Sequence, residues 1–559
     1  MSAKQPSTNR ILAIVLAILV AIAIACGCVW QVLRLLPRRE AASTPQAAPE
    51  AAFAVAYSPE KGELFLELVS AFNEQVAGTS ADVLPVSATQ YEPDLMIEAA
   101  LEGKLHAISP DSSVWLQTLD RQWAERTGRE LPLVGQTERY AISPIVIAMW
   151  EDIARSMGHP EKALGWADLL GRAQSDPSFR WSHPSTNSAA GLLATLAEFY
   201  AGAGKTRGLT EEDVQRQATL DYVAAIEKTV RYYGEGEWAV IQRVRSEGRA
   251  YLDAFVVQEQ LVLYHNMDAR SDRLVAIYPV EGTLWEDHPI ALLELDTLTD
   301  KQRSTFVRFV DFIKAPQQQA TVLASGYRPT DLSISLTAGA SPFSADNGVD
   351  PSQPKTALQM PSPSVIKVVR DVWWYTKRHT NVYLVADVSG SMEGTKLHNA
   401  QQALRVFMEQ IQGDTERLGM IAFSSGPSEV VPLDELKRSR DAISRAIDGL
   451  EAYGDTALLD AVDLAYRRLQ TLGDSERINA IVVMTDGREN NSSIRLDTLT
   501  RRVQEQNQKG VQVLIFTIGY GSDADEKTLR ALAESSGGQY YGGDLETIRR
   551  LYKILSSYF

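Results

Sequence analysis

Residues 381–392, N-V-Y-L-V-A-D-V-S-G-S-M, constrain the fold of this chain more than any other stretch. The apolar run at 382–386 is typical of a buried strand, and it ends directly in Asp387. Hydroxyl side chains follow at Ser389 and Ser391. The sequence therefore predicts a strand that presents one carboxylate and two hydroxyls on a tight loop at its carboxyl end. A set made of oxygen ligands alone suits a hard divalent cation such as Mg²⁺.

The surrounding region, residues 378–559, alternates apolar strands with amphipathic helices. The strands expected after the first lie at 418–423, 429–431, 478–485, 511–520 and 539–541. The expected helices lie at 396–412, 439–450, 456–472, 496–509, 525–535 and from 545 onward. That alternation predicts a doubly wound α/β domain, in which ligands bind beyond the carboxyl ends of the strands.

Two further polar loops fall at this same predicted edge of the sheet. G-D-T at 454–456 comes before a helix, and T-D-G at 485–487 follows a strand. A D-x-S-x-S pattern alone is weak, because it arises by chance in many long chains. The three pieces together, in this order and each at a predicted sheet edge, are specific. They give a constellation of five oxygen-bearing side chains: Asp387, Ser389, Ser391, Thr456 and Asp486.

This pattern resembles the von Willebrand factor type A domain with its metal-ion-dependent adhesion site, and all five positions match. The resemblance implies that Ser389 and Ser391 bind the cation directly, and Thr456 directly or through water. Asp387 and Asp486 would act largely through water. One coordination position would stay open for an Asp or Glu carboxylate of a protein partner. The expected ion is Mg²⁺, with Mn²⁺ or Ca²⁺ as alternatives. Two other readings stay open: acids that only cap their loops, and an ion that only stabilises the fold.

Residues 11–36 are almost wholly apolar, and roughly 20 such residues span a bilayer. We expect a single-pass signal anchor there, with residues 1–10 as a cytoplasmic tail and 37–52 as an Ala/Pro-rich linker. A lipoprotein modified at Cys26 and a signal peptide cleaved after Ala25 are the alternatives. Basic residues flank the apolar run on both sides, so the expected extracytoplasmic location rests on the domain content instead.

Charge and cysteine content exclude several functions. Beyond residue 40 the chain carries a net charge of about −20, and it has no basic stripe, which argues against a nucleic-acid partner. The two cysteines, Cys26 and Cys28, both lie in the apolar segment. The rest of the chain therefore has no disulfide, no thiol-based zinc site and no thiol nucleophile.

Residues 53–330 also alternate strands and helices, and several phrases in them resemble bacterial extracellular solute-binding proteins. The phrases are A-I-S-P-D-S-S-V-W-L, A-I-S-P-I-V-I-A-M, G-W-A-D-L-L, H-P-S-T-N-S-A-A-G-L, A-I-Y-P-V-E-G-T and S-G-Y-R-P. The resemblance implies two α/β lobes with a ligand cleft between them. The strands that cross between the lobes are expected near Ser143 and Tyr278.

The resemblance implies that hydroxyl groups and backbone amides at the starts of helices line this candidate cleft and hold a small anion or another small polar solute. By position they are Ser58, Ser112, Ser143, Asn187 and Ser188. Glu259 and Glu281 are candidates for binding a cationic solute. The simpler interpretation is that the Ser and Asn residues are helix caps and turn formers, and that the two acids are ordinary exposed carboxylates.

Residues 331–377 form the expected connector, which is rich in Ser, Pro and Gly and ends in a helix with Trp373 and Trp374. Together these features predict a membrane-anchored extracytoplasmic protein of the bacterial cell surface. Its function would be Mg²⁺-dependent protein interaction or adhesion on a solute-binding-like scaffold. The alternative is a solute receptor or sensor of an ABC-type transport system. An enzyme is not expected, because no His–carboxylate pair or nucleophile lies beside the predicted metal loop.

Overall fold

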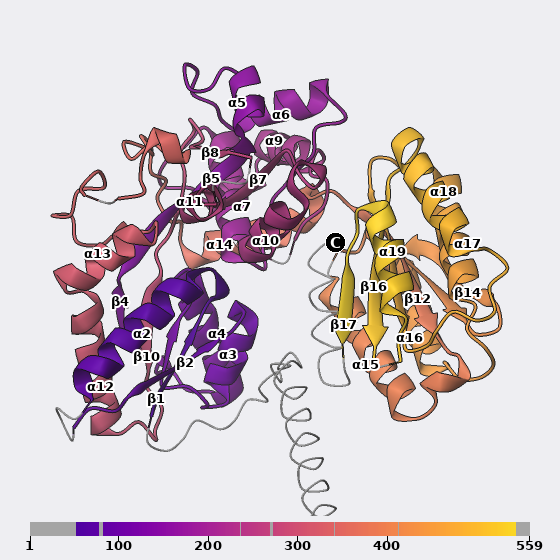
Figure 1. Cartoon of the computed structure of the whole chain (residues 1–559), viewed down its shortest axis with the longest axis horizontal. Coiled ribbons are helices and arrows are strands. Elements are labelled where there is room, and N and C mark those ends of the chain that lie inside the picture. The colour runs from indigo at the N-terminus through magenta and orange to yellow at the C-terminus, as the bar shows by residue number, and fades with distance from the viewer. Residues whose placement is uncertain are drawn as a thin grey trace, which may run out of the picture. The chain divides into compact units, whose positions relative to one another are not determined.

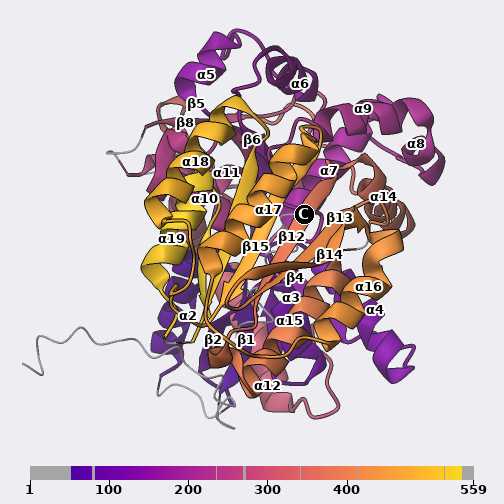
Figure 2. The same ribbon diagram turned by 90° about the vertical axis from the view of Figure 1, so that its right-hand side faces the viewer.

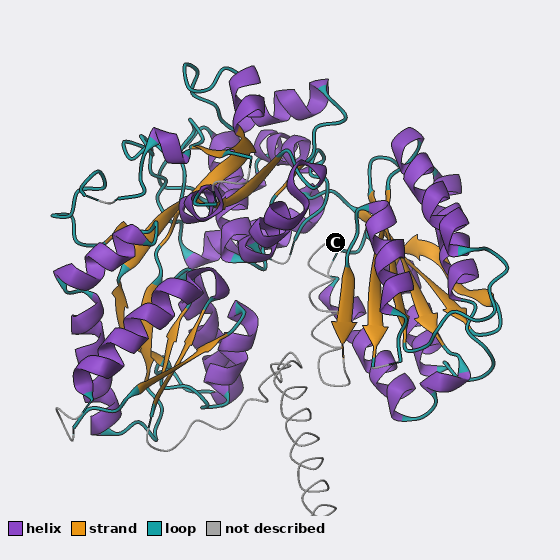
Figure 3. Cartoon of the chain, viewed as in Figure 1, coloured by secondary structure: helices purple, strands orange, loops and turns teal. Residues whose placement is uncertain are grey.

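The computed structural model describes residues 52–77, 82–234, 236–268, 272–339, 341–411, 413–521 and 523–543. The predicted membrane span at 11–36, its flanking tail and all but the last residue of the linker lie outside these ranges, as does the helix expected from 545. Within the described ranges, no helix has the length and apolar character that crossing a bilayer requires. The mixed α/β class is confirmed for the described residues, which form three sheets with helices around them (Figure 3).

The first lobe is built on a five-stranded sheet in the order β2-β1-β3-β10-β4. Its strands are β1 Phe53–Tyr57, β2 Val86–Gln90, β3 Ala107–Ser109, β4 Val134–Arg139 and β10 Pro289–Leu293. Its helices are α2 Gly62–Val76, α3 Pro93–Leu101, α4 Val114–Thr127, α12 Asp300–Ile313 and α13 Pro316–Ala324, with the 3₁₀ turn η1 Pro59–Lys61. Strands β1, β2 and β3 are parallel, whereas β10 runs antiparallel to both of its neighbours.

The second lobe is centred on the long strand β5, Ala141–Trp150, which pairs with four other strands. The remaining strands are β6 Trp181–Ser182, β7 Ala254–Gln258, β8 Leu274–Ile277, β9 Trp285–Glu286 and β11 Arg328–Pro329. Its helices are α5 Glu151–Ser156, α6 Trp166–Ser175, α7 Ala189–Ala203, α8 Glu211–Gln215, α9 Gln217–Glu227, α10 Glu237–Glu247 and α11 Glu259–Asn266, with η2 Gly248–Ala250 (Figure 1).

The chain crosses between the two sheets three times. The first crossing, from β4 to β5 at Tyr140, lies close to the expected position near Ser143. The second lies between β9 and β10 at residues 287–288, about ten residues beyond the expected Tyr278. The expectation was wrong there because β8 and β9 both continue to pair with β5, so the chain leaves the second sheet only after Glu286. The third crossing runs from α13 to β11.

The connector ends in helix α14, Pro363–Thr376, which packs against α7, α8 and α9 of the second lobe. Ser362 caps the helix through the amide of Val365, and Pro363 occupies its first position, as Ser-Pro pairs favour. Trp373 is buried, and its Nε1 donates a hydrogen bond to Glu227 Oε1 at 2.7 Å. This tryptophan is therefore part of the core that α14 shares with the second lobe. The connector also contains the short turn η3 Ala345–Asn347.

The C-terminal domain has one six-stranded sheet in the order β14-β13-β12-β15-β16-β17. The strands are β12 Thr380–Asp387, β13 Arg417–Phe423, β14 Pro427–Glu435, β15 Ile478–Thr485, β16 Val513–Tyr520 and β17 Tyr540–Gly543. The helices are α15 Thr395–Gln410, α16 Leu436–Asp448, α17 Leu458–Leu472, α18 Leu496–Lys509 and α19 Glu526–Ser536, with the 3₁₀ turn η4 Gly390–Met392. All strand pairs are parallel except β13–β14, so β14 is an antiparallel edge strand.

Helices cover both faces of this sheet, which explains why β12 and β15 are buried along their whole length. Successive residues of β12 point to opposite faces. Val382 and Leu384 pack with the apolar residues of α15 and α16, whereas Tyr383 and Val385 pack with those of α17, α18 and α19. Figure 2 shows α17, α18 and α19 lying across the near face of the sheet. The sequence at 382–386 is predominantly apolar because neither face of the strand meets water.

Candidate metal centre

The predicted metal residues gather at the carboxyl ends of β12 and β15. These strands are parallel neighbours in register, with Ala386 opposite Met484, so Asp387 and Thr485 end their strands at the same edge. The loops that follow β12 and β15 therefore begin side by side at this edge. Topology alone therefore brings Ser389, Ser391 and Asp486 to one place, although about a hundred residues separate the two loops in sequence.

Asp387 forms the buried floor of the site. Its side chain is fully buried, and Oδ1 accepts a hydrogen bond from the backbone amide of Ser389 at 2.7 Å. Oδ2 accepts a hydrogen bond from the hydroxyl of Thr485. Burial raises the pKa of Asp387, and the nearby Asp486 raises it further, while the bonds from Thr485 and Ser389 oppose the shift. This carboxylate therefore holds the loop, and a cation beside it would offset the cost of its buried charge.

A chain of hydrogen bonds links the two serines to the second loop. Ser389 Oγ and Ser391 Oγ lie 3.1 Å apart, and Ser391 Oγ donates to Asp486 Oδ1 at 2.7 Å. Ser389 and Asp486 are buried, whereas Ser391 is exposed at the rim. The site is thus lined by oxygen atoms and open to solvent on the side of Ser391.

Thr456 reaches the site because the third loop is bonded to the first. The amide of Tyr453 donates to Val388 O at 2.8 Å, and the amide of Gly390 donates to Gly454 O at 3.0 Å. Gly454 has a φ of +74°, a conformation that glycine adopts without strain. The backbone amide of Thr456 is in turn held by Asn490 Oδ1 at 2.9 Å.

Gly487 gives an independent test of whether a small ion fits. A Cβ placed on this buried glycine would lie 3.3 Å from Thr456 Oγ1 and 3.4 Å from Ser391 Oγ. The two hydroxyls thus lie on either side of a small space that a side chain at this position would partly fill. Hydroxyl and carboxylate oxygens around such a space match the donor set of Mg²⁺, so the residues present fit the ion.

Lys396 contacts the candidate site, and sequence reasoning missed it. It lies in the first turn of α15, and its ammonium group forms an ion pair with Asp486 Oδ2. Its side chain is one-third exposed, while Asp486 is fully buried. The ammonium therefore neutralises the carboxylate that a metal ion would use. In the sequence, the closeness of Lys396 to the site is indicated only by its position, five residues after Ser391 and on the segment that leads from the loop into α15.

The serines predicted for the solute cleft are all engaged in hydrogen bonds within the protein. Ser58 donates to Glu60 Oε1 at 2.5 Å, and Ser112 Oγ accepts from the amide of Val114. Ser143 Oγ accepts from the amide of Gln260 in the first turn of α11, and Ser188 caps α7 through the amide of Gly191. All four serines are buried. Asn187, by contrast, is exposed, and its amide bonds to Ser185 Oγ.

The two glutamates of that set are also engaged. Glu259 is fully buried and forms a bidentate ion pair with Arg328, with both N–O distances at 2.7 Å. It also accepts a hydrogen bond from the hydroxyl of Tyr278. Glu281 caps α6 by accepting from the amides of Trp166 and Ala167. Neither carboxylate is presented free to a solute in this conformation.

A larger acidic cluster lies between the two lobes, and sequence reasoning missed it. Its carboxylates come from η1, the loop after β3, α10 and β9, and the cluster contains one lysine: Glu60, Lys61, Asp111, Glu237 and Glu286, all buried. Among the described residues, neither carboxylate oxygen of Glu286 has a full hydrogen bond, although the Glu237 carboxyl group acts on its pKa and His288 Nε2 lies 3.9 Å from its Oε2. Burial and the charge of Glu60 raise the pKa of Glu237 to about 7. No sequence periodicity marks these residues, because the four carboxyl groups come from four different segments.

Comparison with known proteins supports two domains. Residues 53–328 match the family described as bacterial extracellular solute-binding protein, and residues 381–552 match the von Willebrand factor type A domain. An uncharacterized protein of Synechocystis sp. is 27% identical over 186 residues, covering 32% of this chain and 42% of its own length. An uncharacterized protein of Mycobacterium tuberculosis is 21% identical over 537 residues, covering 88% of this chain and 74% of its own.

Among solved structures, a von Willebrand factor type A protein from Catenulispora acidiphila is 25% identical, with a TM-score of 0.29 over 32% of this chain and 43% of that one. The chain spans less than half of the length of this protein and of the Synechocystis relative. The family matches show that the chain joins a solute-binding-protein domain to a type A domain. This combination supports an extracellular or adhesion-type protein.

Proposed function

We propose that this protein mediates Mg²⁺-dependent protein interaction or adhesion, with Mn²⁺ or Ca²⁺ as substitute ions. The observation that carries this proposal is that Ser391 Oγ lies near Thr456 Oγ1 beside Gly487, near Ser389 Oγ, and within hydrogen-bond distance of Asp486 Oδ1, so that oxygens from three loops gather in one place. The ion would be held by Asp387, Ser389, Ser391, Thr456 and Asp486. When bound, it would supply an electrophilic centre for a carboxylate of the partner.

The donor set explains why a partner carboxylate would bind strongly. Ser389, Ser391 and Thr456 offer neutral oxygens, so the ion keeps most of its positive charge. Mg²⁺ prefers six oxygens and retains several waters, one of which an incoming Asp or Glu can replace. The exposed rim at Ser391 gives that carboxylate its approach. The chain itself then acts by orienting the ion and excluding bulk water from its buried side.

The proposed location is extracytoplasmic, on a bacterial cell surface, with residues 11–36 as a single-pass anchor. The domain content supports this location. The apolar sequence supports the anchor, because it is long enough to span a bilayer. Lipid modification at Cys26 or cleavage after Ala25 remains the alternative mode of export. Mass spectrometry of the protein isolated from membranes distinguishes these forms by the mass of the N-terminal peptide.

Isothermal titration of the chelator-treated full chain with MgCl₂ tests the metal site. The wild type should bind the ion with micromolar-to-millimolar affinity, and Ser389→Ala and Thr456→Ala should weaken binding at least tenfold. Ser475→Ala is the matched control, because this exposed serine lies before β15, at the opposite edge of the sheet. Absence of binding heat, or equal binding by wild type and Ser389→Ala, would exclude the site.

A pull-down from cell-surface extract tests the partner. The wild-type chain should capture a protein in Mg²⁺ and release it in EDTA, and Ser389→Ala should capture none. Substitution of the partner's acidic residues by their amides should abolish capture in the same way. Capture that survives both EDTA and Ser389→Ala would show that the interaction does not use the metal.

The second candidate function, a solute receptor or sensor, is favoured by the acidic cluster between the lobes. Four buried carboxyl groups lie there beside Lys61 and His288. Burial raises the pKa of Glu237 to about 7, and a cationic solute would stabilise the ionised carboxylates. Thermal-shift screening with cationic and anionic solutes tests this function. A stabilising cation whose effect is lost in Glu286→Gln but kept in Thr456→Ala would establish it, and stabilisation by anions alone would refute the cation preference.

A further inference from the structure

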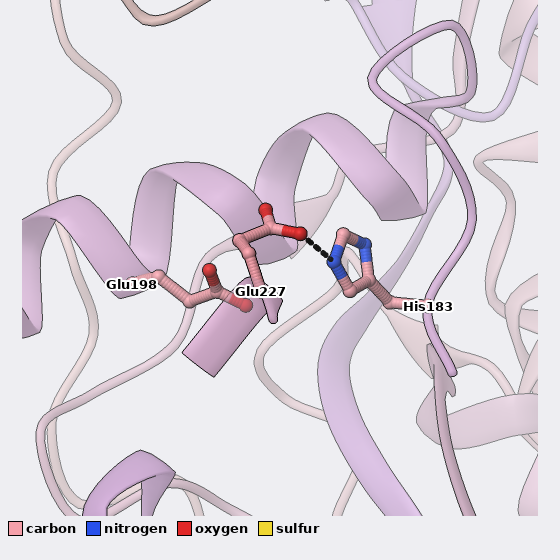
Figure 4. A group of neighbouring side chains, drawn as sticks. All are labelled: His183, Glu198 and Glu227. Atoms are coloured by element: carbon pink, nitrogen blue, oxygen red, sulfur yellow. Dashed lines mark hydrogen bonds and ion pairs between the residues drawn. The ribbon is translucent and has the colours of Figure 1, made fainter. Parts of the chain in front are cut away.

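A second cluster of metal-ligating side chains is buried in the second lobe, remote in sequence from the type A loops. It consists of His183 from the loop after β6, Glu198 from α7 and Glu227 from the end of α9. Figure 4 shows the three side chains converging from these elements. Each has 0% exposure, and one ligand atom from each lies within 4.8 Å of the other two.

The imidazole of His183 is held in one orientation. Its Nδ1 lies 2.8 Å from Pro184 O, and a carbonyl oxygen only accepts, so Nδ1 carries the proton. In the neutral ring, Nε2 then presents a lone pair. That lone pair faces Glu227 Oε2, itself an acceptor, at 3.2 Å. Two acceptors at this distance need a cation or a proton between them.

Glu227 is oriented by two donors of its own. The hydroxyl of Tyr233 donates to Oε2 at 2.6 Å, and Nε1 of Trp373 donates to Oε1 at 2.7 Å. A histidine whose second nitrogen donates to a carbonyl, beside a carboxylate that accepts from further donors, is the usual surrounding of metal ligands. Lys377, whose charge also acts on Glu227, forms its own ion pair with Glu416 at 3.0 Å.

Glu198 supplies the independent observation. Within the part of the chain that the structure describes, neither of its carboxylate oxygens has a hydrogen-bond partner, although the side chain is fully buried. Burial raises its pKa well above the usual range, and the charge of Glu227 adds to the shift. A buried carboxyl group without a partner costs free energy unless a cation or another group satisfies it. Its position beside Glu227 and His183 places that cation among all three residues.

We propose that His183, Glu198 and Glu227 bind a divalent transition metal of the Zn²⁺ class. One imidazole nitrogen and two carboxylates suit Zn²⁺, whereas Mg²⁺ and Ca²⁺ prefer oxygen ligands alone. Two ligands about 2.1 Å from a tetrahedral ion lie about 3.4 Å apart. The observed 3.2 Å between His183 Nε2 and Glu227 Oε2 needs only a small adjustment to share an ion.

Such an ion would act as a structural cross-link. It would join α7, α9 and the loop after β6, and Trp373 would extend the connection to α14 of the connector. The charge of a dication balances the charges of the two carboxylates, so the ion would neutralise a buried negative charge that otherwise has no counter-ion. Because the three ligands are inaccessible to solvent, the ion would bind during folding and exchange slowly.

Metal analysis of the full chain tests this proposal. The protein carries Asp387→Ala, which removes the type A site, and is produced in zinc-supplemented medium and purified without chelator. Mass spectrometry of the elements should find about one Zn²⁺ per chain. Co²⁺ substituted during growth should give the intense visible absorption of a four-coordinate site. Glu198→Gln should lose the metal, and Trp373→Phe should release it to a chromophoric chelator at least tenfold faster.

Glu212→Gln, an exposed glutamate of α8 in the same lobe, is the matched control and should keep the metal. A metal-free wild type would overturn the proposal. So would a Glu198→Gln variant that keeps its zinc, because the charge of Glu198 would then be irrelevant. If Glu198→Gln does not fold, the rate of metal release from Trp373→Phe and the Co²⁺ spectrum test the proposal instead. A release rate equal to that of the parent protein, together with the spectrum of an octahedral Co²⁺ site, would also overturn the proposal.

Discussion

Replacing Lys396 by methionine should tighten Mg²⁺ binding at the proposed type A centre. In this structure the ammonium group of Lys396 pairs with Asp486 Oδ2, while Asp486 Oδ1 accepts a hydrogen bond from Ser391. A Mg²⁺ ion that approaches Asp486 must therefore break this ion pair or lie close to a second cation. Methionine keeps the length of the side chain and removes the charge, so it removes the competition.

The magnitude follows from the geometry of the pair. A hydrogen bond to a charged group contributes roughly 1.5–3 kcal/mol. Asp486 is fully buried but Lys396 is one-third exposed, so water screens part of the attraction and about 1–2 kcal/mol remains. At about 1.4 kcal/mol for each factor of ten, this corresponds to Mg²⁺ binding tightened about 5- to 30-fold.

Titration calorimetry of the full chain at low and at physiological ionic strength measures this effect. Lys396→Arg should leave the affinity near that of the wild type, because the charge is kept. Lys509→Met at the end of α18 changes the net charge equally and serves as the control for long-range electrostatics. If Lys396→Met binds Mg²⁺ no more tightly than the Lys509 control, the ion pair does not compete with the metal and the reasoning is refuted.

Three further predictions follow from other parts of the structure. Burial opposes ionisation of Glu416, but Lys377 and His379 outweigh it and lower its pKa from 4.5 to about 2. The stabilisation is present above pH 4.5 and is lost as the pH falls towards 2. Glu416→Gln should therefore lower the free energy of unfolding in urea by about 3 kcal/mol at pH 7, and should reduce its dependence on pH below 4.5. An unchanged pH dependence of the unfolding free energy would contradict this. Gly191→Ala places a Cβ 2.1 Å from a backbone carbonyl oxygen and should lower the free energy of unfolding by about 3 kcal/mol. Gly171→Ala is the control, because the space around this glycine is open and the substitution should be neutral or stabilising. Thermal unfolding of both variants measures the difference. Because the pKa of Asp387 is raised, the stability of the metal-free protein should fall as the pH rises above 3.8. The affinity for Mg²⁺ should fall as the pH drops below the raised pKa, because the carboxyl group is then protonated. Calorimetry from pH 4 to 7 checks both trends, and an Mg²⁺ affinity that does not change with pH would count against metal contact with this carboxylate.

The C-terminal domain illustrates how far local sequence determines a fold. The central parts of β12 and β15 are predominantly apolar because helices cover both of their faces, and such runs are visible without a structure. A parallel sheet brings the carboxyl ends of its strands to one edge. The sequence could therefore predict that the loops with Asp387 and Asp486 lie at one edge of the sheet, whereas the neighbouring positions of β12 and β15 and their register came from the structure.

The crossing between the lobes shows where local sequence is insufficient. The apolar run that ends at Tyr278 looks like the last strand before a crossing. Whether the chain crosses there depends on whether β9 still pairs with β5, which is a long-range choice between partners. Hydrogen bonds between distant segments decide that choice, and no local propensity records it.

The sequence by itself determined the two α/β domains, the sheet edge and the five oxygen-bearing residues of the proposed adhesion centre. Each of these depends on residues next to one another or on the regular alternation of elements. Only the tertiary structure decided that Lys396 faces Asp486, and that His183, Glu198 and Glu227 meet in one buried cluster. These side chains come from elements with no shared periodicity, and packing against neighbouring segments sets their directions. Packing also decides which buried charges find a partner, and an unpaired carboxylate such as Glu198 becomes visible only in three dimensions.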